Sequence, residues 1–298
     1  MTDTLTGTRP APVPTRPGLV TDIIEFSAVD GPGNRFVIFL QGCSFDCLAC
    51  HNPYTINPCN DCRECVDGCP SGALSVAADG HVTWDESACQ GTDRCIAACR
   101  YDSTPKARRL SVADVLERLR PAAPFLSGIT VTGGEAMRQV IFLRELFLAV
   151  RADPDLRRLT CFVDTNGHVN GPHWDLMCQV MDAAMVDLKC LDNDLHRRIA
   201  GEDNAKVLAS ISTLAQRGKL YEVRLLMLAG LNDSDDLLAR TGRWLAERDP
   251  AMRIKVIGYR HHGVRQSPVP LLEPTAEQRA HYAEVLRAQS ESFELVVV

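Results

Sequence analysis

Residues 35–50 read RFVIFLQGCSFDCLAC, an apolar run followed at once by three closely spaced cysteines. The run is rich in β-branched and aromatic residues, which is typical of a β-strand. Cys43, Cys47 and Cys50 follow it with the spacing Cys-x3-Cys-x2-Cys. Three thiolates on one short loop can hold three irons of a 4Fe–4S cluster and leave the fourth iron without a protein ligand. The stretch therefore predicts a strand that ends in a metal-binding loop, with a zinc site completed by His51 as the alternative.

Strand-like and helix-like segments alternate along the rest of the chain, from about residue 110 onward. Including the opening run, the predicted strands are 35–40, 128–132, 159–163, 184–188, 221–227 and 253–258. The predicted helices are 112–119, 140–150, 174–181, 205–216 and 237–247, followed by a helix at 275–288 and a strand at 293–297. This alternation indicates βαβ units with right-handed crossovers and a parallel sheet. We expect an α/β fold, a partial (β/α)6 barrel.

The overall composition of the 298 residues is that of an ordinary globular protein, with 45% hydrophobic and 23% charged residues. A net charge of −6 without a long basic run argues against binding to nucleic acid or to an anionic membrane. No apolar stretch approaches the length of a membrane span. Residues 1–19 hold four prolines and no apolar segment, so we expect a flexible leader, no signal peptide and a cytoplasmic protein.

Ten of the 13 cysteines lie between Cys43 and Cys99. In a large chain for which we expect no signal peptide, such a density indicates metal binding rather than disulfides. One run reproduces the bacterial ferredoxin spacing in full, with Cys59, Cys62, Cys65 and Cys69 before Pro70. A second run reads Cys89-x2-Thr92-x2-Cys95-x3-Cys99 and has threonine where a cysteine is expected. We therefore expect residues 55–109 to form a ferredoxin-like insert between barrel segments 20–54 and 110–298.

The ligand sets of this insert follow from the exchange of the fourth cysteine between the two clusters of such ferredoxins. One cluster would take Cys59, Cys62, Cys65 and Cys99. The other cluster would take Cys69, Cys89 and Cys95. Its fourth ligand would be Asp93, water or hydroxide, or the cluster would have only three irons. Such an insert suits an electron relay, a docking module or a purely structural element, and a zinc ribbon is the alternative.

Polar and glycine residues follow several predicted strands, at the barrel end where chemistry is expected. Gly133, Gly134 and Glu135 follow the second strand, residues 164–167 (DTNG) the third and Lys189 the fourth. These motifs resemble those of the radical S-adenosylmethionine superfamily and its glycyl radical enzyme activases. The same resemblance includes residues 30–35 (DGPGNR), the Cys43–Cys50 loop, residues 187–189 (DLK) and His196-x4-Gly201. The resemblance covers residues 20–265, and segments 203–208 and 260–265 are most similar to the YjjW-type activases.

The resemblance implies a definite chemistry. The fourth iron binds the amino and carboxylate groups of S-adenosylmethionine, and one electron from the cluster releases methionine and a 5′-deoxyadenosyl radical. That radical takes a hydrogen atom from the Cα of one glycine in a partner glycyl radical enzyme. The implied electron donor is a flavodoxin or a ferredoxin.

The same resemblance implies residue roles. The cofactor-binding residues would be Gly133, Gly134, Glu135, Asp187, Lys189 and Arg224. A monovalent cation would be held by Asp164, Asp187 and the main-chain oxygens of Thr165 and Met185, since oxygen ligands suit a hard cation. Asp30 and Asn166 would contact the incoming glycine loop. Ala49 stands where many members have an aromatic residue, and either Arg260 or His261 stands where activases often have a histidine, so both contacts stay unassigned.

Three other functions stay open from the sequence. The protein could be a radical S-adenosylmethionine enzyme that acts on a small molecule or on another peptide. It could instead be an electron-transfer protein without turnover of S-adenosylmethionine, or a colourless zinc-bound interaction module.

Overall fold

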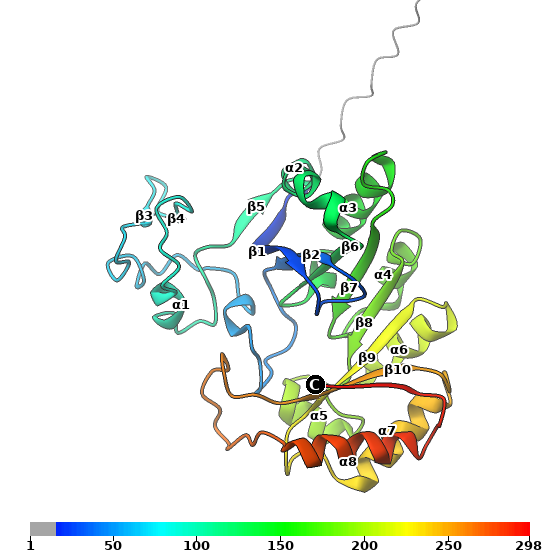
Figure 1. Ribbon diagram of the computed structural model, residues 1–298. Helices are drawn as coiled ribbons and strands as arrows, with labels where there is room; N and C mark the ends of the chain where they lie inside the picture. The colour runs from blue at the N-terminus through cyan, green and yellow to red at the C-terminus, as the bar shows by residue number, and fades with distance from the viewer. Residues whose placement is uncertain (1–15) are drawn as a thin grey trace, which may run out of the picture.

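The computed structural model describes residues 16–298, so most of the predicted 1–19 leader lies outside the described part. A nine-stranded sheet runs through the molecule in the order β11-β10-β9-β8-β7-β6-β2-β1-β5 (Figure 1). The seven parallel strands are β2 (Arg35–Leu40), β6 (Gly128–Gly133), β7 (Thr160–Thr165), β8 (Ala183–Asp187), β9 (Leu220–Met227), β10 (Arg253–Gly258) and β11 (Glu294–Val297). The predicted α/β fold with a partial parallel barrel is confirmed.

Two strands that were not predicted extend this sheet in antiparallel fashion. β1 (Gly18–Ser27) pairs with β2, and β5 (Arg108–Leu110) pairs with β1. β1 begins at Gly18, inside the predicted leader, and β5 begins at Arg108, inside the predicted insert. Their exposed outer positions dilute the apolar pattern, which explains why the sequence did not reveal them.

The helices alternate with the strands and cover the outside of the sheet, as Figure 1 shows for α3, α4 and α6. They are α2 (Val112–Ala122), α3 (Val140–Ala152), α4 (Gly171–Met177), α5 (Asn193–Ala200), α6 (Ala205–Gln216), α7 (Asp235–Ala246) and α8 (Ala276–Arg287), with 3-10 turns at Pro53–Thr55, Ala123–Phe125 and Ala136–Gln139. The helix predicted at 174–181 begins earlier, at Gly171, because Pro172 favours the first turn of a helix, and it ends at Met177. α5 was not predicted, since it is short and mostly polar.

One large core holds the barrel together. Val115 and Leu119 on α2 and Leu143 and Leu146 on α3 are fully buried against the sheet. Ser111 starts α2 with a reciprocal capping box, which satisfies backbone N–H groups that the first turn leaves unpaired. No helix among residues 16–298 is long and apolar enough to cross a membrane.

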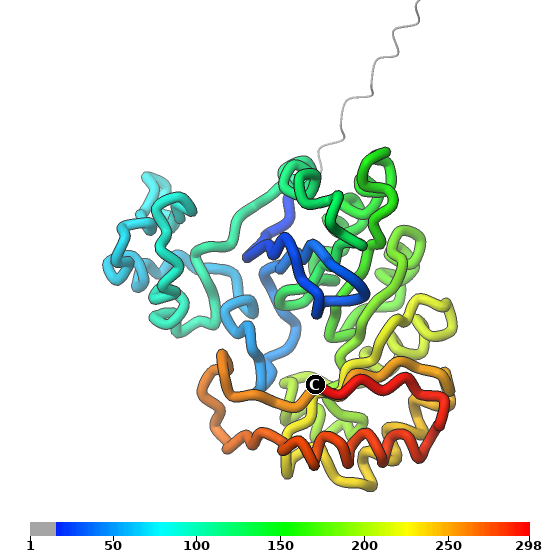
Figure 2. Tube along the Cα trace, in the orientation of Figure 1, coloured from blue at the N-terminus to red at the C-terminus, as the bar shows by residue number. Residues whose placement is uncertain are grey.

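The cysteine-rich segment forms a small body beside the barrel, drawn in cyan in Figure 2. It contains β3 (Leu74–Val76), β4 (Val82–Trp84) and the single turn α1 (Arg94–Ala97). Its buried apolar cluster is small and contains Cys65, Leu74 and Cys95, with a few partly buried side chains packed against it. So small an apolar core does not stabilise a fold by itself, and proteins of this size usually add metals or disulfides.

Candidate active site

The loop that carries Cys43, Cys47 and Cys50 is fixed by backbone hydrogen bonds from distant segments. Asp46 and Leu48 donate their N–H groups to Ala200 and Ile199 at the end of α5, over 3.0 and 2.9 Å. Cys43 donates its N–H to Ile56, also over 2.9 Å. The helix that the sequence did not reveal is therefore one of the supports of the metal-binding loop.

A cavity of about 260 Å³ opens between this loop and the carboxyl ends of the parallel strands. All three predicted cysteines line it, together with Gly133, Gly134, Asp187 and Lys189. Burial raises the pKa of the Cys43 thiol to about 11 and that of the Cys47 thiol to about 12. Soft thiols that are buried in this way become good ligands only when a cationic group stabilises their ionised form.

A 4Fe–4S cluster fits these residues. Three soft donors face one cavity from one loop, and the remaining wall carries no fourth thiol. Within residues 16–298 no three His, Cys, Asp or Glu side chains converge tightly enough for a single metal ion. A cluster presents its irons at separate corners, so its ligands need not converge on one point.

Gly133 and Gly134 are required by the packing of the chain itself. A Cβ atom on Gly133 would lie 2.2 Å from the backbone of Leu40, and Gly133 also has a φ of +123°. A Cβ atom on Gly134 would lie 2.6 Å from the carbonyl oxygens of Gly42 and Thr55. These glycines let β6 approach the start of the cysteine loop, a reason that differs from the predicted contact with methionine.

Glu135 is buried and ties the ends of β6 and β7 together. Its carboxylate accepts hydrogen bonds from Thr165 Oγ1 and the Asn166 N–H, both over 2.7 Å, and from the Met137 N–H over 2.9 Å. Burial raises the pKa of Glu135 to about 7, and these three donors oppose the shift. Glu135 is not among the residues that line the 260 Å³ cavity, so its observed role is to hold the β7 turn.

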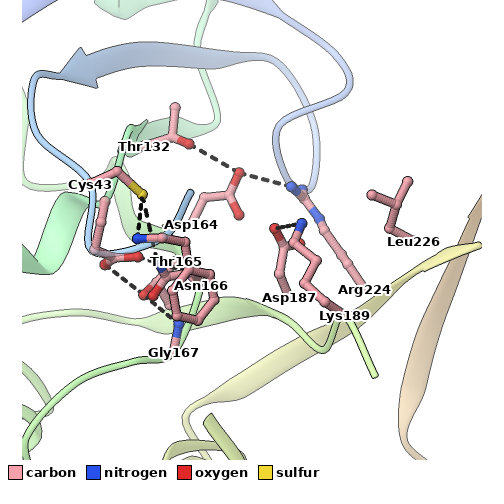
Figure 3. A network of polar contacts seen from close by, with 12 residues as sticks. Cys43, Thr132, Asp164, Thr165, Asn166, Gly167, Asp187, Lys189, Arg224 and Leu226 are labelled. Carbon is pink, nitrogen blue, oxygen red and sulfur yellow. Dashed lines mark hydrogen bonds and ion pairs between the residues drawn. The ribbon is translucent and has the colours of Figure 1, made fainter. Parts of the chain in front are cut away.

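The β7 turn in turn contacts the cysteine loop. Asn166 Nδ2 lies 3.7 Å from Cys43 Sγ and 3.2 Å from Ser44 Oγ, as Figure 3 shows for the Cys43 contact. Asn166 lines the cavity and was predicted as a contact of the glycine loop.

Two acid–base pairs stand side by side across the cavity (Figure 3). Lys189 Nζ donates to Asp187 Oδ2 over 2.7 Å, and Arg224 Nη1 donates to Asp164 Oδ2 over 2.8 Å. Burial lowers the pKa of Lys189, but the charges of Asp187 and the neighbouring thiols outweigh it and the net shift is upward. Lys189 is therefore a buried ammonium that lies beside the cysteine loop.

The four predicted cation ligands come from adjacent strands, because Asp164 and Thr165 of β7 pair with Met185 and Val186 of β8. Burial raises the pKa of Asp164, while the Arg224 guanidinium beside it opposes the shift. Arg224 also donates to Glu222 over 2.9 Å. The predicted contact residue Arg224 is thus held within a network of carboxylates.

Asp30 lies in the β1–β2 connection, away from the cavity lining. Its carbonyl oxygen accepts a hydrogen bond from Thr130 Oγ1 over 2.7 Å, and its charge contributes to the raised pKa of Asp164. The same connection reaches across the open side of the barrel, where Lys255 of β10 lies 3.5 Å from the Val29 carbonyl.

The structure shows where the two unassigned positions lie relative to the cavity. Ala49 is buried and lines the cavity beside Leu226 and Ile257. Arg260 and His261 are both exposed and do not line the cavity.

The insert contains two further cavities, each lined by one of the predicted ligand sets. The four-thiol cavity gathers Cys59, Cys62, Cys65 and Cys99. The three-thiol cavity gathers Cys69, Cys89 and Cys95. Each set combines cysteines from both runs, which is the grouping that the ferredoxin spacing predicts, and the ligation of clusters by these sets stays a prediction.

Arg265 is a connecting residue that the sequence did not reveal. Its guanidinium bridges Asp46 of the cysteine loop and Asp102 of the insert, and its Nη2 also lies 3.2 Å from the Cys47 carbonyl. A charged residue in a polar loop gives no pattern that could identify such a contact in advance.

Comparisons with known proteins agree with this geometry. The radical SAM superfamily model matches residues 37–241. The 4-hydroxyphenylacetate decarboxylase activating enzyme of Clostridioides difficile is 30% identical, over 74% of this chain and 75% of that protein. The (2S)-3-sulfopropanediol sulfolyase activating enzyme of Bilophila wadsworthia is 29% identical, over 83% and 86% of the two chains. The indoleacetate decarboxylase activating enzyme of Tractidigestivibacter scatoligenes is 27% identical, over 91% and 94%.

Solved structures share the fold. A spore photoproduct lyase variant covers 92% of this chain and 78% of its own, with a TM-score of 0.54 at 10% identity. Streptococcus suis SuiB bound to S-adenosylmethionine covers 64% and 44%, with a TM-score of 0.53 at 15% identity. On the family match and the relatives together, this chain belongs to the radical S-adenosylmethionine superfamily and, within it, to the activating enzymes of glycyl radical enzymes.

Proposed function

We propose that this chain forms a glycyl radical on a partner enzyme by cleaving S-adenosylmethionine in the 260 Å³ cavity. The observation that carries the proposal is the meeting of Cys43, Cys47 and Cys50 with the buried Lys189 in that cavity. A cluster held by these thiolates supplies the electron for the cleavage. The protein contributes binding, orientation and exclusion of water.

The lining of the cavity suits the parts of S-adenosylmethionine. The Lys189 ammonium offers a charge-assisted contact for the methionine carboxylate. The apolar side formed by Ala49, Leu226 and Ile257 suits the adenine, in place of an aromatic residue before Cys50. The main chain at Gly133 and Gly134 stays within reach of the methionine amino group.

The two acidic residues leave room for a monovalent cation. Lys189 donates a hydrogen bond to Asp187 Oδ2, and Arg224 and Thr132 both donate to Asp164 Oδ2. In this proposal the Oδ1 atoms of both residues, with the main-chain oxygens of Thr165 and Met185, would supply the oxygen-only set that a hard cation prefers. Arg224 keeps Asp164 in place for this role.

The partner glycine loop enters between Asp30 and Asn166 in this proposal. Asn166 lines the cavity and contacts the cysteine loop, and the charge of Asp30 acts on Asp164 of the cavity lining.

The insert supplies electrons to the first cluster in this proposal. Its two cavities each gather cysteines from both runs, and its small core leaves clusters as the main stabilising element. A flavodoxin or ferredoxin is the external donor, and the cytoplasm is the compartment that keeps the thiols reduced.

The test is an anaerobic assay of S-adenosylmethionine cleavage. The chain is reconstituted with iron and sulfide and reduced, and 5′-deoxyadenosine is quantified after S-adenosylmethionine is added. Replacing Cys43, Cys47 or Cys50 by alanine is expected to abolish the product. Cys178→Ala is the matched control, because Cys178 is a half-buried free thiol outside the cavities described.

The second stage asks for the protein substrate. With a candidate glycyl radical enzyme present, electron paramagnetic resonance should detect a radical on its glycine that depends on the same three cysteines. Full 5′-deoxyadenosine formation by Cys47→Ala would refute the cluster assignment. Product without any protein radical, but with turnover of a small molecule, would instead support the alternative substrate class.

A further inference from the structure

The three-thiol cavity of the insert has a wall that no cysteine supplies. Besides its three thiols, its lining includes Thr92, Asp93 and Lys106. In the four-thiol cavity the matching wall carries Cys62. The question is which group completes a cluster bound by three thiolates here.

The two halves of the insert repeat one backbone conformation, which locates that missing group. Asp61 and Gly91 both have positive φ and donate their N–H groups to the sulfur two residues earlier, over 3.4 and 3.5 Å. Arg63 and Asp93 also have positive φ, 69° and 53°, and accept an N–H from the residue three positions later. Thr92 therefore occupies the place of the exposed cysteine of the first half, with Asp93 directly beside it.

Asp93 is held at this wall by Lys106. The Lys106 ammonium pairs with Asp93 Oδ1, is only 15% exposed and lies 5.9 Å from the centre of the Trp84 ring. Burial raises the pKa of the Cys95 thiol, and the Lys106 charge opposes that shift, so the ammonium lies close to the thiols. Among the hydrogen bonds of residues 16–298, none engages Asp93 Oδ2, and that oxygen is left for another partner.

Neither cavity of the insert is large enough for a substrate. The three-thiol and four-thiol cavities each have a volume of about 10 Å³, against about 260 Å³ for the cavity beside Cys43, and the Asp93 side chain at the rim of the three-thiol cavity is 61% exposed. The side-chain oxygens of Ser71, Gln90 and Thr92 on this wall are neutral, whereas the Asp93 carboxylate, paired with Lys106, carries the negative charge that an iron ion binds best.

We propose that Asp93 is the fourth protein ligand of the cluster in the three-thiol cavity, bound through the oxygen that Lys106 leaves free. The proposal rests on the assignment of clusters to the insert in the proposed function. A carboxylate is a harder ligand than a thiolate, so the iron that it holds is the first to leave on oxidation. Ferricyanide then takes one electron as one ferrous ion departs, and a three-iron cluster remains.

The test counts iron and reads the cluster type by electron paramagnetic resonance. The cluster beside Lys189 also has an open iron, so all variants carry Cys43→Ala, Cys47→Ala and Cys50→Ala in the full chain. Asp93→Ala is expected to lower the iron content by about one atom per chain and to leave a reduced three-iron cluster, which ferricyanide oxidises by one electron without further loss of iron. Thr92→Cys combined with Asp93→Ala should restore the four-iron cluster and make it resistant to ferricyanide.

Two controls separate ligation from other effects. Asp67→Ala removes an exposed acid of the same insert and should leave iron content and spectrum unchanged. Lys106→Met breaks the ion pair but keeps Asp93, and it should retain the fourth iron.

An unchanged iron count and spectrum in Asp93→Ala would overturn the ligand assignment. So would a loss of the fourth iron in Lys106→Met equal to that in Asp93→Ala, because the ion pair would then account for the effect. If Cys69→Ala and Cys95→Ala also left the iron content unchanged, the insert would hold no cluster in this cavity and the failure would lie with the proposed function.

Discussion

The cavity beside Lys189 and the three-thiol cavity of the insert both gather three cysteines, yet the protein surrounds them differently. The first lies at the end of a fully packed barrel, has room for a substrate and faces a buried lysine. The second lies in a body with a small apolar core and has almost no free space. Both sites face a lysine that is paired with a carboxylate, Lys189 with Asp187 and Lys106 with Asp93. The difference shows that an incomplete set of thiolates is a catalytic site only where a cavity and a supporting shell accompany it.

The largest expected effect comes from removing the lysine of the catalytic cavity. Lys189→Met leaves the partly buried Asp187 without its cation and removes the carboxylate contact for S-adenosylmethionine. A charge-assisted hydrogen bond to the substrate contributes about 1.5–3 kcal/mol, which corresponds to a loss of roughly 10- to 100-fold in S-adenosylmethionine cleavage. The measurement is 5′-deoxyadenosine formation at matched iron content.

The matched control is Lys206→Met, which removes an exposed lysine away from this cavity. It should retain full cleavage activity. Equal activity of Lys189→Met and the unsubstituted chain would remove the distinction drawn between the two three-cysteine sites.

A smaller effect is expected from the insert. Replacing Cys62 and Cys65 by alanine should remove about four irons per chain and leave the cluster beside Lys189 intact. With dithionite as a direct reductant, cleavage of S-adenosylmethionine should persist, whereas the rate with flavodoxin or ferredoxin should fall by roughly tenfold or more. If the double variant lost all its iron, the two bodies would not be independent.

The connection between the two bodies can be weakened at Arg265. Arg265→Ala removes a guanidinium that bridges Asp46 and Asp102, and charge-assisted hydrogen bonds of this kind contribute about 1.5–3 kcal/mol. Because the pair is partly exposed, we expect only a three- to tenfold fall in the rate driven by a protein donor. Arg197→Ala, which breaks an exposed pair with Asp203, is the control. A fall of the same size with dithionite would point to damage of the cysteine loop itself.

The last expected effect is on stability rather than on catalysis. Burial raises the pKa of Glu135 from 4.5 to about 7, so the folded state holds this proton more tightly than the unfolded state. The free energy of unfolding should therefore fall between about pH 4.5 and 7, by at most about 1.4 kcal/mol per pH unit, and then level off. Glu135→Gln should lack this fall. The measurement is the melting temperature of both proteins at several pH values between pH 5 and 7.5. The same pH dependence in the unsubstituted protein and in Glu135→Gln would contradict this prediction.

The sequence predicted the strands that alternate with helices to within a few residues, and β2, β10 and α6 had their observed limits. These elements are buried on regular faces, so the apolar period locates them. β1 and α5 were missed because exposure and shortness erase that period. The roles of Glu135 and Arg265 were out of reach, since each depends on partners brought together only by the fold. The finer similarity to YjjW-type activases stays a prediction.

The bonds that fix the cysteine loop have a consequence for how the enzyme is made. Cys47 is translated 218 positions before Arg265, and α5 also follows it far down the chain. At synthesis rates of 5–20 residues per second, the loop waits on the order of 10–40 s for its last support. Iron–sulfur delivery to this loop therefore finds its ligands in place only on a completed chain, whereas the insert already has all its cysteines soon after Cys99 leaves the ribosome.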